Sequence, residues 1–415
     1  MNVVLSIEAI HPPLAGIGRY AWELATRLPL HPDIDSVRYL SDGLWRDLPN
    51  IEVQPSLVPT ALSGFAPSSA SEATSVASVP SLPSVPEAPK LNYKGKIRQQ
   101  LGRLSIVGKV YNKLIPLIAG HQLNSVQNGI FHGPNYFAPK TRLPSVVTVH
   151  DLSIYRYPQW HPKARIDRMR VAIPEAIDRA QLVLTDSLAT RLEVMQEFNL
   201  PPERVQAVLL GVDDVYQPYS EADLAPVLAR FGLRPNGYSF FVSTIEPRKN
   251  LTNLLAAYRA LPEHMRHYWP LVLVGGEGWQ SQDIHDDIER ATREGWLRYL
   301  GFVDQQFLPA LYAGCRLFTY PSWYEGFGLP IAEAMASGVP VLTSDCSSMP
   351  EVADGAAMLV QPGDVDAIHQ GLLQALEDDQ WRHQAIVRGR QRAAELTWDA
   401  CVQNTVAAYK TVRTR

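Results

Sequence analysis

The 415-residue sequence predicts an α/β protein with two doubly wound, Rossmann-like domains that face each other across a cleft. The chain is too long for one hydrophobic core, so two domains are expected. In both halves, short apolar runs alternate with segments of helical periodicity, which is typical of βαβ units and parallel sheets. A candidate hinge at residues 211–214, followed by Pro218, separates the halves. Ligands of such sheets bind beyond the carboxyl ends of the strands, so functional side chains are expected there.

The predicted elements follow the chain in this alternating order. The N-terminal domain, residues 1–208, has expected strands at 3–7, 129–132, 145–150 and 182–186 and helices at 20–28 and 165–179. The C-terminal domain, residues 215–397, has expected strands at 239–243, 271–274, 300–302, 317–320 and 339–343 and helices at 251–261, 284–294 and 307–313. Residues 398–415 form a last amphipathic helix, which we expect to pack back on the N-terminal domain.

Two segments of the first half depart from this alternation. Residues 59–90 are almost entirely Ser, Ala, Pro and Val, which predicts a disordered insertion. No acidic residue occurs between Glu87 and Asp151, and residues 91–118 combine lysines and arginines with apolar residues at helical spacing. Such a basic amphipathic stretch either lies on an anionic bilayer surface or forms a solvated basic face with its apolar stripe in the core.

Composition excludes several classes of protein. The formal net charge of −4 and the pI near 6.3 provide no attraction to nucleic acid. The three cysteines are widely spaced and form no CxxC pair, so neither a disulfide framework nor a zinc site is expected. With no signal peptide and no apolar run long enough to span a bilayer, the sequence predicts a cytoplasmic protein.

The most informative stretch is a glycine-rich turn flanked by Glu325 and Glu333. Pro330 marks the start of a helix, because its missing amide would be unpaired there in any case. A helix N-terminus with free amides is an anion site. Carboxylates beside an anion site suit a ligand that carries both phosphates and hydroxyls, such as a nucleotide sugar. The alternative is a capping acid at Glu333 and a solvated loop acid at Glu325. The amides concerned belong to Gly326, Phe327, Gly328 and Leu329.

Two cations stand at another turn of the C-terminal domain. Arg248 and Lys249 follow the predicted strand 239–243, and Asn250 is a good N-cap for the helix that comes next. At this position the cations would neutralise a departing nucleoside diphosphate. The alternative is an exposed basic turn.

The N-terminal domain offers three further candidates. Gly16 and Gly18 imitate a dinucleotide-binding fingerprint, but residues 8–14, with two prolines, separate them from the strand, which disfavours a dehydrogenase. We expect these glycines instead to let the loop approach a phosphate across the cleft. His150 ends a strand-like run and is a cleft candidate, and His132 is a weaker one of the same kind.

Taken in order, these segments resemble the retaining glycosyltransferases of family 4, which have the GT-B fold. The resemblance covers nearly the whole chain outside residues 59–90, and its most specific part is the E-x7-E element from Glu325 to Glu333. Weaker matches occur in the same order as in the family: TVHDLS, VLTDS, GVD, VSTIEPRKN, LVGGEGW and GFV. One departure is that Ser243 and Thr244 stand where many relatives have an arginine.

The resemblance implies a role for each candidate residue. Glu333 holds the donor ribose, Glu325 lies beside the transferred sugar, and the amides of residues 326–329 bind sugar and phosphate. Lys249, helped by Arg248, stabilises the leaving diphosphate. On the other side of the cleft, Gly16 and Gly18 approach the diphosphate, and His150 touches the sugar. Val303 and its neighbours contact the base.

The implied reaction is transfer of a hexose from a nucleoside diphosphate, with retention and without a metal ion or other cofactor. Relatives with similar motifs suggest a GDP-linked mannose or rhamnose type of donor and an acceptor glycan on polyprenyl diphosphate, in the assembly of surface polysaccharide such as O-antigen. The protein would then work at the cytoplasmic face of an anionic membrane. The alternatives are a nucleotide-sugar epimerase or phosphorylase of the same fold, and a non-catalytic glycan-binding subunit.

Overall fold

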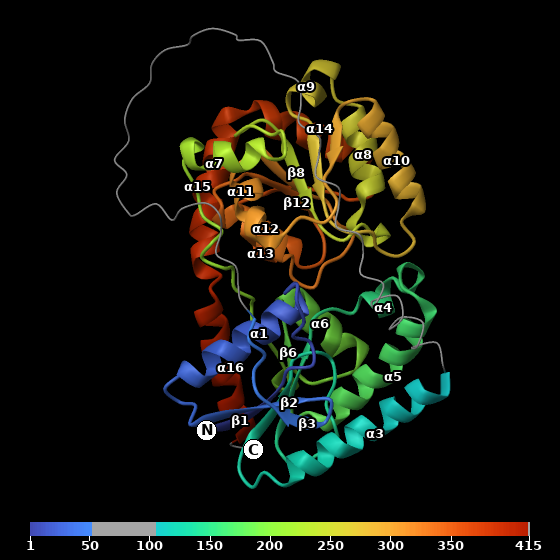
Figure 1. Cartoon of the computed structure of the whole chain (residues 1–415), viewed down its shortest axis with the longest axis vertical. Coiled ribbons are helices and arrows are strands. Elements are labelled where there is room, and N and C mark those ends of the chain that lie inside the picture. The colour runs from blue at the N-terminus through green and yellow to red at the C-terminus, as the bar shows by residue number, and fades with distance from the viewer. Residues whose placement is uncertain (52–104, 414–415) are drawn as a thin grey trace.

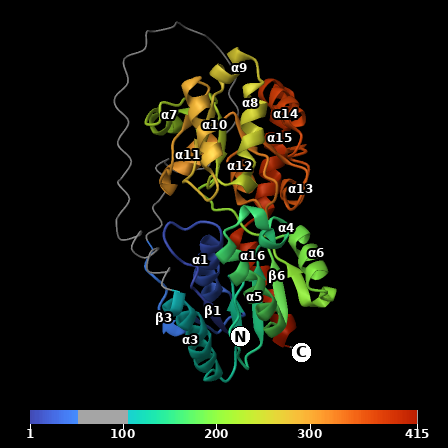
Figure 2. The same ribbon diagram turned by 90° about the vertical axis from the view of Figure 1, so that its right-hand side faces the viewer.

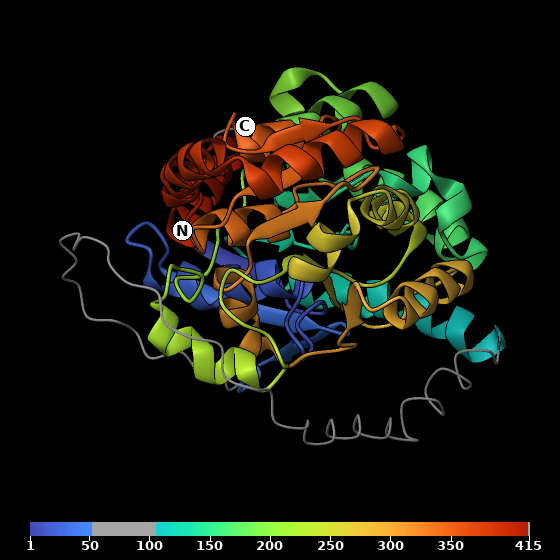
Figure 3. The same cartoon turned by 90° about the horizontal axis from the view of Figure 1, so that it is seen from above.

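A computed structural model describes residues 1–51 and 105–413, with side chains for 1–51 and 114–412. The predicted insertion at 59–90 lies outside the described residues, as does the first part of the basic stretch at 91–118. Two α/β domains lie one above the other in Figure 1, with the C-terminal domain on top, and Figure 2 shows the same division from the side. The predicted fold class is confirmed: each domain is a largely parallel sheet with helices around it (Figure 3).

The N-terminal domain is built on a seven-stranded sheet in the order β3-β2-β1-β4-β5-β6-β7. All neighbouring strands are parallel except β3, which pairs with β2 in an antiparallel hairpin. The strands are β1 (Asn2–Ser6), β2 (Ser36–Ser41), β3 (Leu44–Arg46), β4 (Ile130–Gly133), β5 (Ser145–Val149), β6 (Leu182–Thr185) and β7 (Val205–Ala207).

Helices from both ends of the chain cover this sheet. The helix α16 (Trp398–Arg413) leaves the upper domain and runs along the lower one, where it contacts α1 (Figure 1). Tyr409 hydrogen-bonds with His132 Nδ1 at 2.7 Å, and Lys410 forms an ion pair with Asp33 at 2.7 Å. The other helices of the domain are α1 (Ile17–Arg27), α3 (Ser105–Asn124), α4 (Ser153–Arg156), α5 (Lys163–Arg179) and α6 (Leu188–Glu197), with short 3-10 turns at Leu28–Leu30, Pro158–Trp160 and Pro202–Arg204.

The C-terminal domain has a six-stranded, fully parallel sheet in the order β10-β9-β8-β11-β12-β13. The strands are β8 (Ser239–Val242), β9 (Leu271–Val274), β10 (Leu297–Tyr299), β11 (Leu317–Tyr320), β12 (Val341–Ser344) and β13 (Met358–Val360). The helices are α7 (Glu221–Ala229), α8 (Leu251–Arg259), α9 (Glu263–Tyr268), α10 (Gln282–Arg293), α11 (Leu308–Ala313), α12 (Leu329–Ala336), α13 (Met349–Ala353), α14 (Val365–Glu377) and α15 (Asp379–Glu395), with 3-10 turns at Pro247–Lys249 and Gln305–Phe307.

The central strands are continuous apolar runs in the sequence because both of their faces are buried. Every residue of β5, β6, β9, β11 and β12 is buried. Helices cover both faces of a parallel sheet, so its strands lack the alternation of a half-exposed sheet. By contrast, β2 and the edge strand β3 are mostly half-buried or exposed, and the apolar pattern did not predict them. Helices α14 and α15, which cover the C-terminal sheet, were also not predicted.

One predicted strand is wrong by a few residues. Residues 300–302 were expected to form a strand, but β10 ends at Tyr299. Gly301 has a φ of 65°, which turns the chain out of the extended conformation. Phe302 is consequently 68% exposed, and it lies on the rim of the cavity described below.

The order of the strands in each sheet determines where the functional loops lie. In each sheet the strand order reverses once, between β1 and β4 in the first domain and between β8 and β11 in the second. The loops leaving β1, β8 and β11 therefore open toward the space between the domains, where ligands of doubly wound sheets bind. Among the described residues, no helix has the length and apolar character needed to cross a membrane.

Candidate active site

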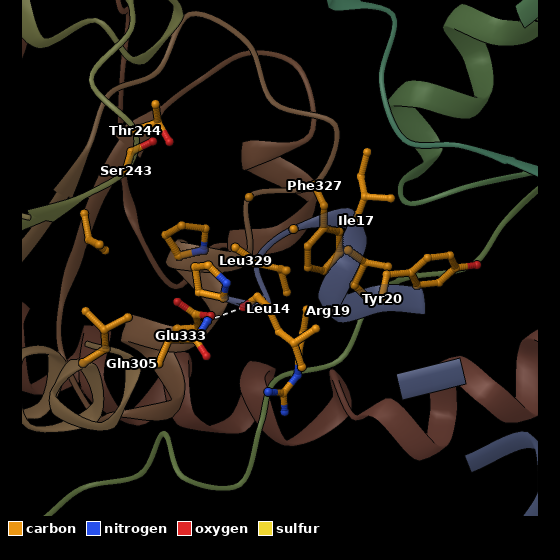
Figure 4. Close-up of a pocket in the computed structure, with 18 of the residues that line it drawn as sticks. Leu14, Ile17, Arg19, Tyr20, Ser243, Thr244, Gln305, Phe327, Leu329 and Glu333 are labelled. Atoms are coloured by element: carbon orange, nitrogen blue, oxygen red, sulfur yellow. Dashed lines mark hydrogen bonds between the residues drawn. The ribbon is translucent and has the colours of Figure 1, made fainter. Parts of the chain in front are cut away.

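A cavity of about 930 Å³ lies between the two domains, at the carboxyl ends of both sheets. The N-terminal domain lines it with the loop after β1 and the ends of β5 and β6. The C-terminal domain lines it with the turns after β8 and β11 and with the start of α12. Figure 4 shows side chains of both domains meeting there, among them Arg19, Phe327 and Glu333. The predicted residues that line it are Gly16, His150, Arg248, Lys249, Glu325, Gly326, Phe327, Gly328, Leu329 and Glu333.

Arg248, Lys249 and Glu325 form one buried charged cluster. Lys249 Nζ donates to Glu325 Oε1 at 2.6 Å, and Arg248 donates to Glu325 Oε2 at 2.9 Å. Arg248 also pairs with Glu246 at 2.8 Å. The turns after β8 and β11 are 76 residues apart in sequence at this contact, but their strands are neighbours in the sheet. Both the lysine and the carboxylate can therefore reach one small ligand.

Electrostatics keep this cluster ionised. Burial by itself would raise the pKa of Glu325, but Arg248 and Lys249 lower it to about 2. Burial and the Arg248 charge lower the pKa of Lys249, while Glu325 and Glu246 oppose that shift. A carboxylate held by two cations is a poor nucleophile, so the arrangement favours a role for Glu325 in orienting groups rather than in attacking carbon.

Asn250 stands at the N-cap position of α8, as predicted, but its side chain does not cap the helix. Its backbone is left-handed, with a φ of 59°, and its side chain makes no capping hydrogen bond to the start of α8. Instead its amide nitrogen donates to the carbonyl oxygens of Pro321 at 2.9 Å and Pro362 at 2.7 Å. Asn250 thereby fastens the turn that carries Lys249 to the loops after β11 and β13.

The glycine-rich turn forms the wall of the cavity before α12. Gly328 occupies the N-cap position with a φ of 104°, a conformation that glycine adopts without strain. In the described residues, no hydrogen-bond acceptor faces the backbone amides of Gly326, Phe327 and Gly328. These amides remain available to an anionic ligand, as the sequence predicted.

Glu333 lies one turn into α12 and lines the cavity beside Arg19 and Asp213. Tyr312 donates its hydroxyl to Glu333 Oε2 at 2.7 Å. Burial and the Asp213 charge raise the pKa of Glu333 to about 7, although Tyr312 and Arg19 act in the opposite direction. Near neutral pH this carboxyl can therefore accept hydrogen bonds from hydroxyls as a carboxylate or carry a proton itself.

His150 lines the cavity, but both of its ring nitrogens are engaged within the N-terminal domain. Nδ1 pairs with Asp186 at 2.7 Å, and Nε2 lies 2.8 Å from the carbonyl oxygen of Pro134. The Asp186 contact raises the pKa of His150 in spite of burial. Its contact with a sugar stays a prediction. His132, the weaker candidate, is buried against Thr148 and Tyr409 outside the cavity, and burial lowers its pKa to about 3.

Two of the predicted donor-binding residues do not line the cavity. Gly18 does not line it: a side chain there would come within 2.8 Å of the Ala9 carbonyl oxygen, so Gly18 permits close packing inside the first domain. Val303 is buried in the hydrophobic core, and its neighbours Phe302, Asp304 and Gln305 line the cavity in its place. Gly16, with a φ of 50° and open space around it, remains at the cavity wall.

The sequence prediction missed several residues of the cavity. Arg19 forms an ion pair with Glu23 at 2.7 Å and a second with Asp213. Asp213 was noted only as part of the candidate hinge and of the weak GVD match, with no role of its own. The signal that could have found them is position, because Arg19 directly follows Gly16-Ile17-Gly18 and Asp213 ends Gly211-Val212-Asp213. For the residues described, no three His, Cys, Asp or Glu side chains are grouped as metal ligands.

Comparison with known proteins agrees with this geometry. Residues 234–392 match the family model of glycosyl transferases group 1. The chain is 38% identical over 411 residues to the O-antigen chain mannosyltransferase B of Escherichia coli, covering 99% of this chain and 100% of that protein. It is 31% identical over 239 residues to the MMP α-(1→4)-mannosyltransferase of Mycolicibacterium hassiacum, covering 55% of this chain and 53% of that protein.

A solved structure has a similar fold. The structure of the Anabaena protein HepE in complex with UDP and glucose superposes with a TM-score of 0.67 and 16% identity, covering 99% of this chain and 100% of that one. At this identity the likeness bears on the fold alone, and that fold is GT-B. The full-length relationship above confirms the predicted family: the chain belongs to the group 1 glycosyltransferases, and it is a hexosyltransferase of family 4 with the GT-B fold.

Proposed function

We propose that this enzyme transfers mannose, with retention, from GDP-mannose to a lipid-linked glycan acceptor during assembly of an O-antigen-like polysaccharide. The observation that carries the proposal is the contact of Lys249 and Arg248 with Glu325 beside the free amides of the glycine-rich turn. The names of two relatives, both mannosyltransferases and one an O-antigen chain enzyme, support the sugar and the pathway class.

In this proposal the protein acts by positioning and by charge. The bond from the anomeric carbon to the diphosphate oxygen breaks, and a bond from that carbon to an acceptor hydroxyl oxygen forms on the same face. The hydroxyl proton passes to the departing diphosphate. Lys249 and Arg248 neutralise the negative charge that develops on the leaving group, so the reaction needs no metal ion. Glu333 accepts hydrogen bonds from the ribose hydroxyls.

A transfer assay tests the proposal. Incubation of the enzyme with GDP-mannose and a mannosylated polyprenyl-diphosphate glycan is expected to extend the glycan by mannose, detected by mass spectrometry, and to release GDP. Parallel reactions with GDP-rhamnose, UDP-glucose, or no acceptor serve as controls. Equal turnover of UDP-glucose would contradict the proposed donor. Conversion of GDP-mannose in the absence of any acceptor would instead favour an epimerase.

The pKa of Glu333 makes donor affinity depend on pH. Since the ionised carboxylate is the better acceptor for ribose hydroxyls, we expect the dissociation constant for GDP-mannose to rise by about tenfold between pH 8 and pH 6. Calorimetric titration across this range measures it. The stability of the free protein changes in the opposite direction. Because the folded state holds the Glu333 proton more tightly than the unfolded chain does, the free energy of unfolding falls as pH rises from 4.5 to about 7 and levels off above that.

Glu333→Gln is the control for this pH effect. It should bind GDP-mannose more weakly at pH 8 and show little change between pH 6 and 8. A wild-type dissociation constant that stays flat across the range would contradict the role given to Glu333.

We also propose that the enzyme works as a peripheral protein on the inner face of an anionic membrane. Helix α3 contains no acidic residue, and three of its apolar side chains remain exposed: Leu114 at 49%, Leu117 at 69% and Ile118 at 41%. Basic and apolar residues on one helix favour the surface of an anionic bilayer.

Vesicle sedimentation tests this membrane contact. The protein should bind vesicles containing phosphatidylglycerol and fail to bind those of phosphatidylcholine alone. Leu117→Ser should weaken binding several-fold, whereas Leu30→Ser, which changes an even more exposed leucine elsewhere on the domain, should leave it unchanged. Equal binding by both variants and the wild-type protein would contradict a role for α3.

A further inference from the structure

Three consecutive backbone carbonyls in the glycine-rich turn are held by hydroxyl groups. The Glu325 oxygen accepts from Ser347 at 2.8 Å, and the one hydroxyl proton of Ser348 is shared between the Glu325 oxygen at 2.9 Å and the Phe327 oxygen at 2.7 Å. Both serines belong to the C-terminal domain. The middle carbonyl belongs to Gly326, and it accepts hydrogen bonds from two hydroxyl groups of the N-terminal domain.

That cross-domain contact comes from the start of α6. Ser187 Oγ donates to the Gly326 oxygen at 2.7 Å, and Thr190 Oγ1 donates to the same oxygen at 3.2 Å. Both hydroxyl-bearing residues are fully buried, so no water replaces them in this arrangement. Neither residue lines the cavity.

The orientation of each amide follows from that of the preceding carbonyl. A peptide unit is planar and trans, so its C=O and its N–H point in opposite directions. Hydroxyls that hold the carbonyls of residues 325–327 on one side therefore fix the N–H groups of Gly326, Phe327 and Gly328 on the other. All three residues line the cavity, and their amides have no acceptor among the described residues.

The hydroxyl contacts are part of a larger contact between the two domains. A side chain at Gly326 would come within 1.9 Å of the His150 carbonyl oxygen, so only glycine allows this approach. Nearby, Glu351 of α13 accepts hydrogen bonds from the amides of Leu188 at 2.8 Å and Ala189 at 3.1 Å, at the start of α6. The Gly326 carbonyl thus meets its hydroxyls only when the domains are together.

We propose that Ser187 and Thr190 are positioning residues for the donor: by holding the Gly326 carbonyl, the N-terminal domain orients the Phe327 amide toward the donor's diphosphate. The proposal rests on the proposed function, because it takes the ligand of these amides to be a nucleoside diphosphate sugar. Its consequence is that the amide array is complete only in the closed enzyme. Donor binding and domain closure then stabilise each other.

A pair of double variants of the full chain tests this proposal. Ser187→Ala with Thr190→Val removes both hydroxyls at nearly constant shape. Ser187→Thr with Thr190→Ser exchanges the residues and keeps both hydroxyls. Calorimetric titration with GDP-mannose and with guanosine should show about 10- to 50-fold weaker binding of GDP-mannose to the first variant, as for two lost hydrogen bonds. Guanosine affinity should be unchanged, and the exchanged variant should resemble the wild type.

The first variant also loses a helix cap, since Ser187 Oγ accepts from the Thr190 amide at 3.1 Å. Melting temperatures measure that loss separately. Thr405→Val, which removes another buried hydroxyl bonded to a backbone carbonyl, should lower the melting temperature without changing GDP-mannose affinity.

The outcomes separate this proposal from the proposed function. Unchanged GDP-mannose affinity in the first variant, or an equal loss for guanosine, would overturn the positioning role while leaving the donor assignment intact. A wild-type protein that binds neither GDP-mannose nor guanosine would overturn the donor assignment, and the positioning role with it.

Discussion

Replacing Lys249 by alanine is expected to lower kcat by about 10²–10³-fold, the loss seen when one preorganised group that stabilises developing charge is removed. Lys249 is buried and contacts both Glu325 and the Tyr320 hydroxyl, which lies 2.7 Å from its Nζ. Its ammonium therefore points at a fixed place in the cavity wall. Steady-state kinetics with varied GDP-mannose would separate this effect from donor binding, since the lost charge acts mainly on the departing diphosphate.

Two further variants control this experiment. Tyr320→Phe removes the hydroxyl partner but keeps the lysine charge, and should change kcat by less than about tenfold, in keeping with one neutral hydrogen bond. Lys249→Arg keeps a charge in a different shape, and is expected to recover activity only in part. If Lys249→Ala retained kcat within tenfold of the wild type, the leaving-group role would be refuted.

The second large effect is expected for Glu325→Gln. Removing one partner of a buried ion pair destabilises a protein by about 3–5 kcal/mol, because the remaining charges stay buried without compensation. Here two cations, Arg248 and Lys249, lose their shared carboxylate, and Arg248 keeps its ion pair with Glu246. We expect a lower melting temperature and a loss of activity, because both cations lose their fixed position.

The pH dependence of stability checks the electrostatic origin of this effect. The pKa of Glu325 is lowered from 4.5 to about 2, so its stabilisation is present above 4.5 and is lost as pH falls toward 2. The difference in unfolding free energy between wild type and Glu325→Gln should therefore shrink over that range in urea titrations. Glu277→Gln, at an exposed position, is the control and should show no such difference. A gap that stays constant down to pH 2 would point to packing rather than charge.

The local pattern was sufficient to predict most elements that build the site. The strands before Lys249 and Glu325 are buried on both faces and flanked by turn residues, so they could be recognised as continuous apolar runs. The glycines and Pro330 marked the start of α12 and its free amides. The prediction failed where burial is incomplete, in the outer hairpin of β2 and β3, and where a backbone conformation overrides the usual preference of a residue. Asn250 was expected to cap α8, but it adopts a left-handed conformation and binds two distant carbonyls.

Residue types and their local spacing, taken alone, determined that this chain forms two parallel α/β domains and that cations, carboxylates and free amides stand at the ends of its strands. Only the tertiary structure decided which of them meet. The strand order puts β8 beside β11 and so brings Lys249 onto Glu325. Packing around Gly18 and Val303 keeps both residues out of the cavity, and contact between the domains brings Ser187 and Thr190 to Gly326. The physical reason is that local preferences act over a few neighbouring residues, whereas strand order and domain contact depend on burial and hydrogen bonding between segments far apart in the chain.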